Sequence, residues 1–261
     1  AVGSGITALL NGLAAGGLGF RGTFALAVVP LMGVLWLRHG LVEPDRFSIA
    51  AARAEHAMPV FGAVGRRFRR NLLVVAALAF FVSVVSGPAN SFAFVYGQNV
   101  LRQSGAATAV MVVVAAPIGL VGLLLGRWLA DHAGRRLAGS LSMAGIALAA
   151  LVTYSGSRAA FYGGYEIAVF LGGCFAPAAG AFSNELFPTS VRASVAGWNV
   201  AASVFGAVIC LLLFGSVADV GNRFATGGLV TFLPVVVTAG LFWLLPETKG
   251  KELEELWPED A

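Results

Sequence analysis

Long apolar runs separated by short polar segments dominate the chain. Eight runs reach or approach the roughly 17–20 apolar residues that a helix needs to cross a bilayer. They cover residues 2–19, 22–37, 71–95, 106–129, 137–155, 160–182, 193–214 and 225–245. The runs lack strict alternation and exceed the length of ordinary strands, so the pattern predicts helices. The sequence therefore predicts an all-α membrane protein with about eight transmembrane helices.

The composition supports this prediction and argues against a nucleic-acid-binding protein. Of the 261 residues, 58% are hydrophobic and 11% are charged, whereas soluble domains carry about 25% charged residues. The net charge is +4, but the basic residues lie between the apolar runs. Lys and Arg residues that set the topology of membrane proteins have this distribution. We therefore expect the lipid bilayer as a partner and no nucleic acid.

The basic residues collect on alternate connections between the predicted helices. Thirteen of the 17 Lys and Arg residues lie on one set of connections. The other set holds one per loop: Arg21, Arg102, Arg158 and Arg223. Because cytoplasmic loops are enriched in Lys and Arg, the richer set is assigned to the cytoplasm, together with both chain ends. The preference for Arg over Lys, with abundant Ala and Gly, favours a multi-pass protein of a bacterial inner membrane.

One long connection divides the chain. Residues 38–70 contain a basic run at 66–70 and separate two predicted helices, in residues 1–37, from a block of six in residues 71–245. A polar tail follows at 246–261. The chain opens within apolar sequence, without Met or a signal peptide, so we expect an N-terminal truncation.

Polar side chains inside membrane spans are costly and usually functional. We expect a solute pathway lined by Asn90, Ser91, Gln98, Asn99, Glu166 and Asn199. For Asn90 and Asn199 the structural alternative is a hydrogen bond to a neighbouring helix. Glu166 is either a proton-carrying carboxylate or an interfacial carboxylate beside tyrosines.

The sequence shows no enzymatic or metal-binding pattern. Its three His and two Cys residues lack metal-ligand spacing, and neither a phosphate-binding glycine loop nor a nucleophile elbow is present. We expect no enzyme activity, no metal and no cofactor.

Three polar segments near predicted helix ends each combine acidic and basic residues. They are residues 126–136 (GRWLADHAGRR), 185–192 (ELFPTSVR) and 246–250 (PETKG). Such charges can pair in one conformation and separate in another, which would form a gate. Simple anchoring at the membrane surface is the alternative.

The same segments resemble motifs of the major facilitator superfamily. Residues 126–136 resemble its G-x-x-x-D-x-x-G-R-R loop, with one extra residue before the Asp. Residues 185–192 and 246–250 are similar to segments of the sugar porter and metabolite:proton symporter branches. The resemblance implies that residues 71–245 are the six-helix C-terminal half of a twelve-helix transporter. Residues 1–37 would then hold the last two helices of the N-terminal half, and the missing N-terminal helices would be partners.

The resemblance implies secondary active transport of a small solute, such as a sugar, an organic acid or a related metabolite, by proton symport and alternating access. It places a cytoplasmic charge network at Asp131, Arg135, Arg136, Glu185, Arg192 and Glu247. Hexose porters carry a Trp where this chain has Gly180, so a hexose is not favoured. The alternatives are a non-transporting receptor or scaffold on the same fold and a membrane-embedded enzyme.

Overall fold

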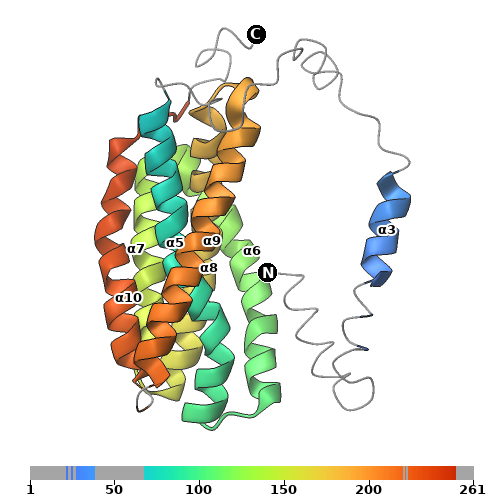
Figure 1. The fold of residues 1–261 in the computed structure, drawn as a ribbon, viewed down its shortest axis with the longest axis vertical. Helices are drawn as coiled ribbons and strands as arrows, with labels where there is room; N and C mark the ends of the chain where they lie inside the picture. The colour runs from blue at the N-terminus through green and yellow to red at the C-terminus, as the bar shows by residue number, and fades with distance from the viewer. Residues whose placement is uncertain are drawn as a thin grey trace.

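Six long helices form the bundle that the apolar runs predict (Figure 1). The computed structural model describes residues 22, 25, 28–38, 68–219, 221 and 223–250. Six helices within these residues are long and apolar enough to cross a membrane. They are α5 (Arg69–Val95, continued by the π-helix η1, Tyr96–Val100), α6 (Gly105–Ala133), α7 (Arg135–Thr153), α8 (Arg158–Glu185), α9 (Thr189–Asp219) and α10 (Phe224–Thr238, continued by the 3-10 helix η2, Ala239–Leu244).

Serine side chains cap the starts of two of these helices, α6 and α8, which begin at residues 105 and 158, slightly before the predicted spans. The hydroxyl of Ser104 accepts a hydrogen bond from the backbone N–H of Ala107 at 3.1 Å and caps α6. Ser157 caps α8 in the same way, through the N–H of Ala160 at 3.0 Å. Such caps satisfy N–H groups that a helix leaves unpaired at its start.

The two N-terminal spans remain predictions. The only helix described there is α3 (Val28–Arg38), which lies within the predicted span 22–37 and has 11 residues. The predicted span 2–19, the connection up to residue 67 and the tail after residue 250 lie outside the described residues.

Close glycine contacts hold two pairs of parallel helices together. α5 packs chiefly on α9, and α6 packs chiefly on α8. A Cβ atom on Gly206 of α9 would lie 2.3 Å from the carbonyl oxygen of Phe80 on α5. A Cβ atom on Gly122 of α6 would lie 2.1 Å from the carbonyl oxygen of Phe170 on α8. The strongest packing of α5 and of α6 is thus with a helix that does not follow it directly in the chain.

Tyr154 links α7 to the turn of α5 that contains Pro88. Its hydroxyl donates to the carbonyl oxygens of Pro88 at 3.3 Å and Ala89 at 3.1 Å. The ring is buried and packs against Phe214 and Phe224, with centroid distances of 5.2 and 6.1 Å. Neighbouring helices commonly stabilise a proline-containing membrane helix in this way, and Tyr154 fixes α5 just before it continues into η1.

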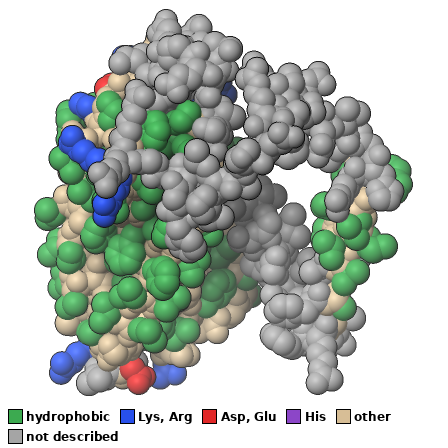
Figure 2. Space-filling view, turned by 45° about the horizontal axis from the view of Figure 1, so that its top comes forward, with side chains coloured by type: hydrophobic (Ala, Val, Ile, Leu, Met, Phe, Trp, Pro, Cys, Tyr) green, Lys and Arg blue, Asp and Glu red, His purple; other side chains and the backbone are tan. Residues whose placement is uncertain are grey.

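Charged side chains gather at the two ends of the bundle and leave an apolar middle (Figure 2). We call the end where α6 and α8 finish and α7 and α9 begin the network end. Among the described residues, its basic side chains are Arg69, Arg70, Arg127, Arg135, Arg136, Arg192 and Lys249. The opposite end has Arg102, Arg158 and Arg223. This is the unequal distribution that the loop sequences predict.

We expect Gly122→Ala and Gly206→Ala each to lower the thermal stability of the detergent-solubilised protein, because each methyl group would collide with a backbone carbonyl. Overpacking of this kind costs about 1–3 kcal/mol. The matched control is Gly163→Ala, since a Cβ atom there meets nothing within 4 Å. Melting followed by size-exclusion chromatography measures the effect, and equal melting temperatures for all three variants would contradict the proposed role of the glycine contacts.

Candidate functional site

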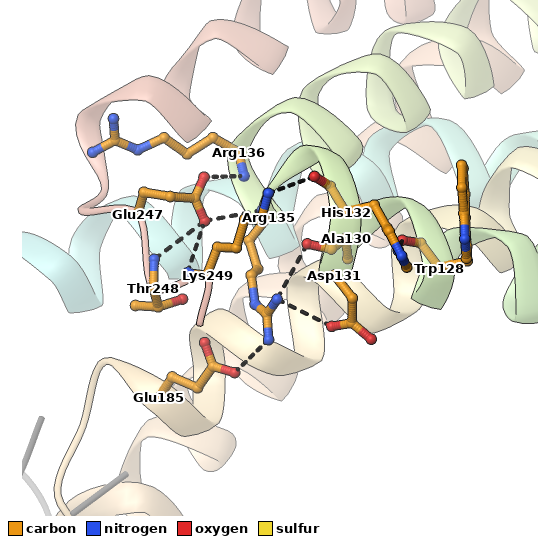
Figure 3. A network of polar contacts seen from close by, with 10 residues as sticks. All are labelled: Trp128, Ala130, Asp131, His132, Arg135, Arg136, Glu185, Glu247, Thr248 and Lys249. Carbon is orange, nitrogen blue, oxygen red and sulfur yellow. Dashed lines mark hydrogen bonds and ion pairs between the residues drawn. The ribbon is translucent and has the colours of Figure 1, made fainter. Parts of the chain in front are cut away.

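Arg135 is the centre of a polar network at the turn between α6 and α7 (Figure 3). Its Nη1 donates to Asp131 Oδ1 and to the carbonyl oxygen of Ala130, both at 3.1 Å. Its Nη2 donates to Glu185 Oε1 at 3.2 Å. The side chains of Arg135 and Glu185 are 14% and 18% exposed, so this ion pair is largely shielded from solvent. One guanidinium therefore joins the ends of α6, α7 and α8.

Glu247 reaches the start of α7 from the segment after η2. Its Oε1 and Oε2 accept hydrogen bonds from the backbone N–H groups of Arg135 at 3.0 Å and Arg136 at 3.1 Å. Oε1 also accepts from the N–H groups of Thr248 and Lys249, both at 3.2 Å. A carboxylate is favoured at a helix N-terminus by its unpaired N–H groups and by the helix dipole. Partial burial opposes ionisation of Glu247, but the four N–H donors outweigh it and hold its pKa below the ordinary value.

Gly134 makes this contact possible. Its φ of +102° is a conformation that residues with a side chain rarely adopt. A Cβ atom on Gly134 would also lie 2.9 Å from Glu247 Oε2. Because Gly134 has no side chain to cap α7, a carboxylate 112 residues after Arg135 takes that role.

A second link joins the tail to the end of α6. Lys249 Nζ donates to the carbonyl oxygen of His132. His132 in turn donates from Nδ1 to the carbonyl oxygen of Trp128 at 2.8 Å, and its ring stacks on the indole at a centroid distance of 4.7 Å. The sequence analysis did not predict these contacts.

The structure unites four of the six residues predicted for the charge network. Asp131, Arg135, Glu185 and Glu247 bond as described. Arg136 contributes its backbone N–H, while its side chain points away from the carboxylates (Figure 3). Arg192 donates from Nε to the carbonyl oxygen of Phe187 at 3.0 Å, at the turn between α8 and α9.

Two cavities lie along α5 and α8. The larger, of about 470 Å³, is lined by α5, α6, α7 and α8 and includes Asn90 and Tyr165; we call it the Asn90 cavity. The smaller, of about 230 Å³, is lined by α5, α8, α9 and η2 and includes Asn199; we call it the Asn199 cavity. Val82 and Phe175 line both cavities and so form the wall between them.

Both asparagines line a cavity and also bond within the bundle. Asn90 Nδ2 donates to the carbonyl oxygen of Ser86 at 2.7 Å, and Asn90 Oδ1 accepts from the Tyr165 hydroxyl of α8 at 3.3 Å. Asn199 Nδ2 donates to Ser183 Oγ of α8 at 3.1 Å. The pathway role and the helix-pairing alternative are therefore compatible for both residues.

The other predicted pathway residues do not line these two cavities. Gln98 Nε2 donates to Thr108 Oγ1 of α6 at 3.2 Å, and Ser91 and Asn99 are exposed. Glu166 is half-buried, and its Oε2 is shielded with no hydrogen-bond partner among the described residues.

The predicted pathway residues do not include Tyr165, Ser183 and Ser203, which line the cavity walls. Helical spacing could have identified part of the set. Ser86 and Asn90 are four residues apart, as are Ala179 and Ser183, and such pairs share one helix face. Gly180 lies in the wall of the Asn199 cavity, and a Cβ atom there would meet open space.

Comparison with known sequences decides the family. The family described as "Sugar (and other) transporter" matches residues 48–259. This chain belongs to that family. The sugar transporter family member is 28% identical over 205 residues to the putative metabolite transport protein YncC of Bacillus subtilis (strain 168), covering 72% of this chain and 42% of YncC. It is 23% identical over 251 residues to the MFS-type transporter lnaF of Aspergillus flavus, covering 90% of this chain and 49% of lnaF.

The matches confirm the resemblance to the major facilitator superfamily and its sugar porter-like branch. This sugar transporter family member spans less than half the length of either relative. The names of the relatives, like the family itself, point to a transporter and not to an enzyme.

We expect Gly134→Ala to destabilise this family member more than Gly156→Ala does. Both glycines have similar positive φ, +102° and +104°, so an alanine at either position meets backbone strain of about 1–3 kcal/mol. Only the methyl group at position 134 would displace Glu247, and loss of a capping contact adds about 1 kcal/mol. Chemical or thermal unfolding in detergent measures the difference. In a Glu247→Ala background the difference between the two glycine substitutions should shrink by about 1 kcal/mol, and an unchanged difference there would contradict the capping role.

The contribution of Glu247 to stability should depend on pH. Its pKa is lower in the folded protein, so its stabilisation is complete above the ordinary pKa of 4.5 and is lost as the pH falls through the lower, folded value. The melting temperature of the native protein should exceed that of Glu247→Gln by a constant margin between about pH 5 and 8. In more acidic buffer the margin should shrink, and a margin independent of pH would show that the charge of Glu247 contributes nothing.

Proposed function

We propose that the protein is part of a secondary active transporter that carries a small solute across the membrane by alternating access. The observation that supports this best is the pair of cavities along α5 and α8, each with an asparagine in its wall, below a network of ion pairs at one end. A scaffold on the same fold would need neither the cavities nor the amides. A membrane-embedded enzyme would need convergent catalytic groups, and the described residues contain no group of three or more His, Cys, Asp or Glu that could hold a metal ion.

The division of the chain follows from this proposal. Residues 71–245 are the six-helix C-terminal half, residues 38–70 the central connection, and residues 246–261 a tail at the same side of the membrane. Residues 1–37 hold the last two helices of the N-terminal half. The remaining N-terminal helices complete the solute pathway, because both cavities are walled here by one half alone.

We assign the network end to the cytoplasm. The excess of basic residues at this end of the described helices supports the assignment, which puts the chain ends in the cytoplasm of a bacterial plasma membrane protein. Arg135 there holds the ends of α6, α7 and α8 together through Asp131 and Glu185. These ion pairs are the natural points of separation when the pathway opens to the cytoplasm.

Glu166 is the proposed proton carrier for symport. Glu166 Oε2 lies shielded within a membrane span and has no hydrogen-bond partner among the described residues, a position that is costly for a charged carboxylate. Protonation removes that cost, so conformations that shield Glu166 bind a proton, and conformations that expose it to water release one.

Proton coupling can be tested with the full-length protein in liposomes that contain a pH-sensitive dye. We expect addition of a transported solute, from a panel of labelled sugars, organic acids and neutral ring compounds, to cause proton entry together with solute uptake. A protonophore should abolish accumulation. Glu166→Gln should keep downhill exchange of the solute but lose proton entry, because an amide cannot carry the proton.

Asp219→Asn is the matched control for that experiment, since Asp219 is exposed at the opposite end of the bundle. Solute uptake without proton entry would overturn symport and indicate a uniporter. Absence of uptake for every solute in the panel would favour the receptor or scaffold alternative.

A further inference from the structure

Two arginines approach the end of η2 from two different helices. Arg70, the second residue of α5, donates from Nη2 to the carbonyl oxygen of Leu244 at 3.4 Å. Arg136 lies three residues before Gly139 on α7, so these two residues share a helix face. That face is turned toward η2, because a Cβ atom on Gly139 would lie 2.4 Å from the ring of Phe242. The two arginines therefore converge on the last turn of η2.

The charges of these two arginines are not neutralised within the described residues. The ion pairs between described residues all involve Arg135. The carboxylate of Glu247 is occupied by backbone N–H groups, and the side chain of Arg136 points away from it (Figure 3). Arg136 Nε is shielded and has no hydrogen-bond partner among the described residues. A shielded guanidinium N–H without an acceptor is unfavourable, so an anion at this position would be stabilised.

An exposed apolar stripe runs along α10 and η2 up to these arginines; we call it the α10 stripe. Its members follow one another at spacings of four and three residues and are all exposed: Leu233, Val237, Gly240 and Trp243. The helix α10 lines neither cavity and lies at the edge of the bundle (Figure 1), so the stripe faces lipid. A Cβ atom on Gly240 would meet nothing within 4 Å, which leaves room for an acyl chain along the stripe.

Trp243 indicates that the arginines lie at the height of the lipid headgroups. Tryptophan is enriched at membrane–water interfaces, where its ring lies at the headgroup level. The exposed Trp243 directly precedes Leu244, whose carbonyl oxygen accepts from Arg70. Guanidinium groups bind phosphate through paired N–H donors. A phospholipid at this place would therefore put its phosphate at the arginines and an acyl chain on the α10 stripe.

The charge of the two arginines favours an anionic lipid over a zwitterionic one. Phosphatidylglycerol presents a phosphate and no cation, whereas phosphatidylcholine carries a trimethylammonium group beside its phosphate. Two guanidinium groups would repel that additional cation. Basic residues near a membrane surface attract anionic lipids for the same reason.

We infer that Arg70 and Arg136 bind the phosphate of an anionic phospholipid, with Trp243 at the headgroup level and an acyl chain along the α10 stripe. A lipid bound in this way joins the starts of α5 and α7 to the end of η2, and so adds to the attachment that Glu247 makes. The inference holds whether or not the protein transports a solute.

Native mass spectrometry of the delipidated full-length protein in detergent tests the lipid site. The probes are phosphatidylglycerol and phosphatidylcholine with identical acyl chains, so that only the headgroup differs. The variants are Arg70→Gln, Arg136→Gln and the double substitution. Arg127→Gln is the matched control, since Arg127 is exposed at the same end of the bundle but belongs to α6. Size-exclusion chromatography verifies that each variant is folded.

We expect the native protein and Arg127→Gln to bind phosphatidylglycerol equally well, and more tightly than phosphatidylcholine. Each single substitution at Arg70 or Arg136 should weaken the binding of phosphatidylglycerol about fivefold, the effect of one basic residue near an anionic lipid, and the double substitution about twentyfold. The binding of phosphatidylcholine should be the same for all variants. Phosphatidylglycerol should also raise the melting temperature of the native protein more than that of the double variant.

Equal binding of phosphatidylglycerol by the native protein and the double variant would overturn the lipid site, as would equal binding of the two lipids by the native protein. Displacement of phosphatidylglycerol by millimolar inorganic phosphate would assign the arginines to a soluble anion instead. The tail of the chain is a further anion, with five Asp and Glu residues between 251 and 261. If phosphatidylglycerol binds only after residues 251–261 are removed, the tail is the occupant and the lipid site is wrong.

Discussion

The interaction on which the network end depends is the attachment of two carboxylates to the start of α7. Gly134 gives the chain its turn out of α6 but supplies no capping side chain, so the first N–H groups of α7 bond to Glu247. Arg135 follows directly on this turn, and its side chain bonds to Glu185. One helix start thereby ties the end of α8 and the segment after η2 to the same point.

The helices between residues 69 and 244 could be predicted because the signal is local. Uninterrupted apolar length requires a helix wherever backbone groups must pair without water. The ends of the helices were less predictable, since Ser104 and Ser157 extend them into polar sequence by capping. The pairing of α5 with α9 was not predictable, because it depends on a few glycine positions rather than on a pattern that repeats.

The candidate site was only partly predictable, for a geometric reason. Asn90 and Ser91 are neighbours in sequence, but successive residues on a helix point about 100° apart, and only Asn90 lines a cavity. Tyr165 and Glu166 differ in the same way. The network was predicted better, because motif resemblance places distant charges together. It did not reveal that Glu247 bonds to backbone N–H groups rather than to an arginine side chain.

The pairing of non-consecutive helices has a consequence for biogenesis. α5 is the first of the six helices to leave the ribosome and its chief partner α9 the fifth, while α6 must wait for α8. Each early helix therefore enters the lipid with its packing face uncovered, and bundle assembly is delayed until the late helices arrive. Interrupted synthesis would leave a membrane-inserted intermediate whose packing faces are open to quality-control proteases or to the wrong helix.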